Sequence, residues 1–86
     1  MKKMETLKLK NGQTINGHAL ESDGRLFLYM YDITLTDAFN ALIDPNNTKV
    51  IKEDRNGIET TYRGYNHLYN VTEETGGMIS AAIKKS

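Results

Sequence analysis

Histidine, serine and glycine residues are the first places to look for chemistry in this sequence. His18 and His67 lie far apart along the chain, and neither has another His or an Asp nearby at the spacing of a metal site. The sequence has no cysteine, which excludes a disulfide, a thiolate zinc site and a redox motif. Its serines lie outside any nucleophile-elbow pattern, and its glycines form neither a P-loop nor a dinucleotide fingerprint. We therefore expect no enzyme, no catalytic residue, no cofactor and no bound metal; a small hydrolase or metal-dependent enzyme is the least favoured alternative.

Tyrosine is the residue type that most suggests a working surface. Five of the seven aromatic residues are Tyr, which combines a large apolar ring with a polar tip and is enriched at binding hot spots. Three of the five fall within eight residues, interleaved with Arg63. Two interpretations stay open, since Tyr also fits a half-exposed strand: packing, or a protein-binding patch. The residues expected to contact a partner are Tyr29, Tyr31, Asp32, Asp37, Tyr62, Arg63, Tyr65 and Tyr69.

The net charge is zero, with 11 basic and 11 acidic residues. This balance makes direct nucleic-acid binding an unfavoured function, because general binders need a basic surplus to displace counterions from phosphates. The charges are nevertheless unevenly placed: residues 1–10 carry an excess of three positive charges, residues 11–48 an excess of four negative charges, and residues 49–86 one positive charge. A dipole of this kind could orient a protein partner. The alternative is the ordinary unevenness of charge in a small domain.

The length of 86 residues predicts a single domain, residues 1–86, in which residues 1–4 are flexible. A chain of this size buries a modest core, so a partner protein or a second copy of the chain would add stability. No apolar stretch is long enough to span a membrane, and the Lys-rich start is not followed by the apolar run of a signal peptide. We expect a cytoplasmic protein without a membrane partner.

The first third of the chain predicts three strands. Leu7 and Leu9 alternate with polar residues, and the next strand, residues 13–21, carries Ile15. A three-residue turn with a left-handed Gly12 pairs Leu7 with Ile15 and keeps the apolar side chains on one face, so we favour it over a two-residue turn. The pair Asn16-Gly17 predicts a bulge or bend in the second strand. Residues 26–31 are apolar on both faces, as is typical of a central strand.

The rest of the chain predicts one helix and three strands. The helix covers about residues 35–44, capped by Thr34 or Thr36 and ended by Pro45. A core-facing stripe is expected at Leu35, Ala38, Phe39, Leu42 and Ile43. Strands follow at residues 49–52 and at 58–72, the latter with a bulge at Gly64, and residues 78–83 form a last strand or a short helix. The predicted fold is α+β: a mostly antiparallel, strongly curled β-β-β-α-β-β-β sheet packed on one helix.

Several segments carry a resemblance to known proteins. Residues 7–12, 36–51, 62–68 and 78–85 resemble small proteins encoded in phages and prophages of Gram-positive gut bacteria, some of which look like tail or baseplate accessories. The resemblance implies a phage setting and carries no functional residue with it. Two functions follow as expectations. The first is a non-enzymatic protein that binds or assembles with a phage structural protein. The alternative is a small inhibitor of a host defence nuclease, similar to an anti-CRISPR protein, that acts in the host cytoplasm by steric occlusion.

Overall fold

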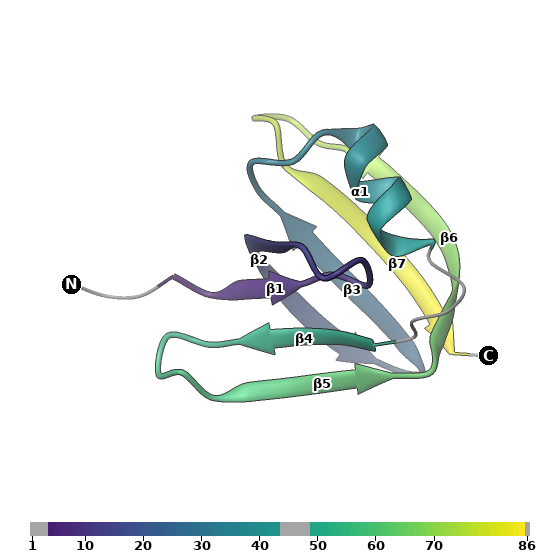
Figure 1. Cartoon of the computed structure of the whole chain (residues 1–86). Coiled ribbons are helices and arrows are strands. Elements are labelled where there is room, and N and C mark those ends of the chain that lie inside the picture. Colours follow the sequence, from purple (N-terminus) through teal and green to yellow (C-terminus); the bar gives the residue numbers. More distant parts are fainter. Residues whose placement is uncertain (1–3, 44–48, 86) are drawn as a thin grey trace.

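The computed structural model describes residues 4–43 and 49–85. Of the residues expected to be flexible, 1–3 lie outside this range. The described residues form one sheet of seven strands in the order β5-β4-β1-β2-β3-β7-β6, with every ladder antiparallel, and one helix. In chain order the elements are β1 (Thr6–Lys8), β2 (Thr14–Ser22), β3 (Arg25–Met30), α1 (Leu35–Leu42), β4 (Lys49–Glu53), β5 (Glu59–Arg63), β6 (Tyr65–Glu73) and β7 (Ile79–Lys85) (Figure 1).

The hairpin between β1 and β2 has the register that the apolar alternation predicts. Leu7 pairs with Ile15. The Leu9 amide donates to the Gln13 carbonyl at 2.8 Å, and the Gly12 amide donates to the Leu9 carbonyl at 2.9 Å. Gly12 has a φ of 88°, so the three-residue turn is confirmed. This register places the apolar side chains of both strands in the core.

The predicted bend at Gly17 is the point where β2 changes neighbours. Residues 14–16 pair with β1, and residues 17–22 pair with β3. A Cβ atom at Gly17 would lie 2.5 Å from the Tyr29 carbonyl oxygen and 2.9 Å from Leu7 Cδ1, so a larger residue would displace the backbone of β3. Gly17 thereby allows one strand to join the two halves of the sheet.

The long stretch 58–72 divides at Gly64 into two strands, so the expectation of six strands is wrong by one. Gly64 has a φ of 82°, in the left-handed region, where an L side chain is strained. This single residue connects β5 and β6, which stand at opposite ends of the strand order. Residues 79–85 form β7, which confirms the strand and excludes the helical alternative there.

The helix begins where the capping residue predicts and turns a different face to the core. Thr34 is the N-cap, and its Oγ1 accepts from the Asp37 amide at 3.1 Å. The helix ends at Leu42, earlier than expected, with Ile43 as its C-cap; Asp44 and Pro45 lie outside the described residues. The buried helix residues are Ala38, Ala41 and Leu42, whereas Leu35, Phe39 and Ile43 are exposed, which corrects three members of the expected core stripe. Ala38 and Ala41 allow the helix to approach the sheet closely, and Leu42 is the one large helix side chain that packs into the core.

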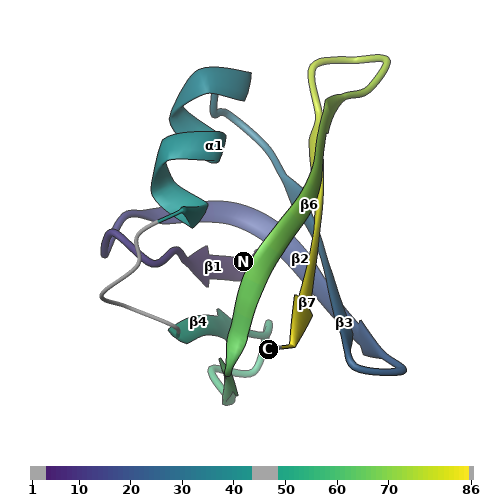
Figure 2. The ribbon, with the colours of Figure 1, turned by 90° about the vertical axis from the view of Figure 1, so that its right-hand side faces the viewer.

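Buried side chains from all seven strands and the helix form one cluster, which includes Leu7, Leu26, Leu42, Val50 and Tyr62. Figure 2 shows α1, β1 and β4 on one side of β3, β7 and β6. The expected α+β class, with a mostly antiparallel sheet and one helix, is confirmed. The strand order is open, and no ladder pairs β5 with β6 within residues 4–43 and 49–85. In the same ranges, no helix is long and apolar enough to cross a membrane.

Candidate functional site

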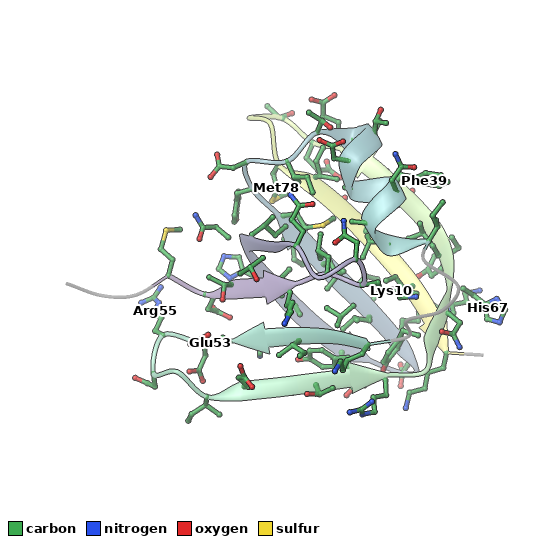
Figure 3. The ribbon with its side chains drawn as sticks, in the orientation of Figure 1. Lys10, Phe39, Glu53, Arg55, His67 and Met78 are labelled. Carbon is green, nitrogen blue, oxygen red and sulfur yellow. The ribbon has the colours of Figure 1, made fainter. Side chains whose placement is uncertain are left out.

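Three large apolar side chains form an exposed line along α1. Leu35, Phe39 and Ile43, which we call the helix stripe, are spaced four residues apart and therefore share one side of the helix. Their exposed fractions are 41%, 47% and 45%. Leu35 and Phe39 border a shallow depression of about 280 Å³ together with Val71 of β6. Figure 3 shows Phe39 on the side of α1 that faces β6. Solvent thus reaches an apolar surface that runs from the helix to the neighbouring strand.

Polar residues border the helix stripe on one side. Thr36, Asp37 and Asn40 are exposed on the same helix, and no basic residue lies in its last turn. An apolar centre with a polar rim is the usual arrangement of a protein-binding surface. The predicted partner residue Asp37 lies at least about 120° around the helix from each residue of the helix stripe, so it is not part of this edge.

A second uncovered surface lies on the opposite side of the sheet. Figure 2 shows no described element against this side of β3, β7 and β6. Side chains alternate along strands, so residues opposite each other in the ladders share this side: Phe27 faces Ala82, and Arg25 faces Lys84. We call this surface the outer sheet face and define it by Arg25, Phe27, Tyr29, Tyr69, Ala82 and Lys84.

The eight residues expected to contact a partner do not form one surface. Tyr62 and Tyr65 have exposed fractions of 7% and 1% and belong to the core. Of the two interpretations left open for the tyrosines between residues 62 and 69, packing fits Tyr62 and Tyr65, and only Tyr69 of the three is exposed. In a continuous strand, Tyr62 and Tyr65 would point to opposite faces; the break at Gly64 resets this alternation, so both point inward.

Two pairs of the expected residues do come together. Tyr29 and Tyr69 border one depression of about 320 Å³ on the outer sheet face. Tyr31 and Asp32 border another, of about 290 Å³, whose remaining lining is largely hydroxyl and amide side chains. Arg63 lies apart from both pairs, exposed at the end of β5.

The histidines are placed at the surface. His18 Nδ1 lies 3.1 Å from Glu5 Oε2, and its ring meets the Tyr31 ring edge-on at 5.7 Å between centroids. His67 stands on β6 and points away from the molecule (Figure 3). Among residues 4–43 and 49–85, no group of three or more His, Cys, Asp or Glu side chains is placed to hold a metal ion.

Tyr65 joins three elements at the start of β6. Its hydroxyl donates to Glu21 Oε2, and its carbonyl accepts from Lys10 Nζ at 2.8 Å. Lys85 Nζ lies 5.4 Å from the centre of its ring. Burial, followed by the hydrogen bond to the Glu21 carboxylate and the charge of that group, raises the pKa of Tyr65 to about 12. A hydroxyl held protonated in this way links strands and makes a poor base or nucleophile.

Sequence reasoning missed the helix stripe and the basic part of the outer sheet face. The helix contained a signal, because the apolar residues of the segment 35–43 span about 200° of the helical wheel, far wider than one packing face requires. A helix with this pattern has more apolar residues than one core contact can bury, so the remaining ones are available for a second contact. Arg25 and Lys84 gave no signal, because 59 positions separate them and only the β3–β7 ladder brings them together.

Comparisons with protein-family models, curated proteins and solved structures give no match to this chain.

Proposed function

We propose that this chain is a non-enzymatic protein-binding domain of phage or prophage type that acts through surface contacts in the cytoplasm of the host. The observation that carries the proposal is the exposed helix stripe of Leu35, Phe39 and Ile43. Large apolar side chains that stay in contact with water beside a packed core are typical of a surface that a partner covers. The partner is a phage structural protein or a host defence protein, and the contact acts by assembly or by occlusion.

The shape of the surface supports a protein partner. The depression beside Val71 is shallow, and its lining is almost entirely apolar. It offers few fixed polar groups of the kind that orient a small ligand. The exposed Thr36 and Asn40 on the adjoining side of the helix would add polar contacts beside an apolar centre.

We also propose that the sheet of this protein is strongly curled. β5 and β6 stand at opposite ends of the strand order, yet Gly64 alone separates them along the chain. Figure 1 shows β5 running directly into β6, with β1 and β4 in front of the fainter β2 and β3. In a sheet curled in this way, α1 packs against the sheet on one side and the helix stripe stays on the outer surface of the molecule.

Affinity capture from the lysate of phage-infected host cells tests this function. Wild-type protein should retain a discrete partner, and Phe39→Ser should lose it because a polar side chain breaks the apolar centre. Ile58→Ser is the matched control, since Ile58 is 61% exposed in the β4–β5 turn, away from α1. The proposal fails if Phe39→Ser retains the partner, or if both variants lose it equally. A retained nuclease whose cleavage is blocked would assign the inhibitory role, and retained virion proteins would assign the structural one.

A further inference from the structure

The outer sheet face presents three aromatic rings around a shallow depression. Phe27 and Tyr29 stand on β3, and Tyr69 stands on β6, two strands away and therefore roughly 10 Å across the sheet. Ala82 of the intervening β7 has a small side chain, so the rings border a depression of about 320 Å³. Aromatic rings that border a depression on a sheet surface are suited to stacking against other planar groups.

Positive charge gathers at one end of the same face. Arg25 lies directly opposite Lys84 in the β3–β7 ladder, and Lys84 lies directly opposite His67 in the β6–β7 ladder. The like charges of Arg25 and Lys84 repel each other in these opposed positions, and all three side chains are exposed. Lys84 Nζ lies 4.9 Å from the centre of the Tyr69 ring, so the cations adjoin the aromatic surface. The acidic side chain of Glu21 points to the other side of the sheet, where it accepts from a core tyrosine. Glu74 lines the depression at the end away from Arg25 and Lys84, where its Oε1 accepts from Ser80 Oγ at 2.9 Å.

We propose that the outer sheet face binds single-stranded nucleic acid. Unstacked bases would lie against Phe27, Tyr29 and Tyr69, and the phosphates would lie at the cations Arg25 and Lys84, beside the imidazole of His67. Asn70, which lines the same depression, carries an amide able to hydrogen-bond to a base edge. The zero net charge of the whole chain argued against this function, but the ladders concentrate cations where the rings are.

Single-stranded nucleic acid fits these observations better than the two nearest alternatives. An acidic peptide would satisfy the cations and would leave the three rings without a planar partner. A duplex keeps its bases stacked, so the rings within the depression would not reach their faces. The outer sheet face and the helix stripe lie on opposite sides of the sheet (Figure 2), so this proposal does not depend on the proposed protein-binding function.

Fluorescence anisotropy with the purified full chain and a labelled oligothymidine of about ten nucleotides tests the proposal. We expect binding at about 20 mM salt that weakens steeply towards 200 mM. Two phosphate contacts, at Arg25 and Lys84, predict a slope of about −1.4 in the logarithm of the association constant against the logarithm of salt concentration. Binding to a duplex of the same length should be weaker at every salt concentration.

Two variants and two controls locate the site. Tyr69→Ala, at an exposed ring, should weaken binding about five- to a hundred-fold by removing one stacked base. Lys84→Gln should reduce the salt slope by about 0.7, the share of one phosphate. Arg55→Gln removes the same charge at the opposite end of the molecule from His67 (Figure 3), and Phe39→Ala removes an aromatic ring from α1; both should bind like wild type. Thermal unfolding of each variant checks that it is folded.

Four outcomes would overturn the proposal. The first is no change in anisotropy at low salt, and the second is equal affinity for the duplex and the single strand. The third is an equal loss of oligonucleotide affinity in Arg55→Gln and Lys84→Gln. The fourth is a polyglutamate peptide that binds more tightly than the oligonucleotide and whose binding is weakened by Lys84→Gln. The last result would assign the outer sheet face to acidic peptides instead.

Discussion

The contacts of Tyr65 explain why a residue expected at the surface is part of the framework. Its ring is buried at the start of β6, its hydroxyl donates to Glu21, and its carbonyl accepts from the buried Lys10. A Tyr ring in a core is stable when its hydroxyl has a partner. These contacts tie β6 to β2 and to the end of β1, close to the point where Gly64 connects β5 and β6.

Replacing Tyr65 with Phe should destabilise the fold at neutral pH by about 1 kcal/mol, because the hydrogen bond to a carboxylate is lost. The pKa of Tyr65 is raised to about 12 in the folded state, against roughly 10 in an unfolded chain. The stabilising contribution is therefore complete below pH 10 and declines as the pH rises from 10 towards 12. Urea unfolding of both proteins across this range should show the difference in free energy of unfolding shrinking. A constant difference would contradict this account.

The sequence predicts where the helix lies along the chain, but it does not predict which face of the helix packs against the sheet. Thr34, Asp37 and the periodicity locate its beginning, because capping and spacing are local properties. The face that packs depends on how closely the helix approaches the sheet, which is a property of the assembled fold. Ala38 and Ala41 permit a close approach, and this favours a different face from the one with the largest side chains.

The two faces of α1 should respond differently to substitution. Leu42 is 1% exposed, so Leu42→Ala should lower the free energy of unfolding by about 2–4 kcal/mol. Phe39→Ser, on the helix stripe, should lower it by about 1 kcal/mol or less. Urea denaturation followed by circular dichroism measures both. Equal losses would mean that Phe39 is buried in solution, by the core or by a second copy of the chain; a dependence on protein concentration would identify the second copy.

The strands show the same division between local and distant causes. The β1–β2 register was predictable because one turn and one alternation determine it. The inward direction of both Tyr62 and Tyr65 was not predictable from the sequence. It depends on a break between two strands at Gly64, and the sequence there is equally consistent with a bulge within one strand. The pairing of Arg25 with Lys84 could not be predicted from the sequence, because it depends on the complete strand order.

At the scale of the whole molecule, one core receives side chains from all seven strands and the helix within the described ranges. No element retains a separate core once the others are removed, so unfolding should be a single cooperative transition. Far-UV circular dichroism reports the backbone, and tyrosine fluorescence reports the buried rings, since the chain has no tryptophan. The two urea curves should share one midpoint. Separate midpoints would show that the β1–β4–β5 part and the β3–β7–β6 part unfold independently.

The packing of α1 also bears on how this protein can change over generations. The residues that attach the helix to the sheet, Ala38, Ala41 and Leu42, are different from those that it presents to solvent. Mutations at Leu35, Phe39 and Ile43 therefore leave the buried contacts intact. A lineage carrying this fold can therefore vary the side chains of the helix stripe while keeping the same architecture.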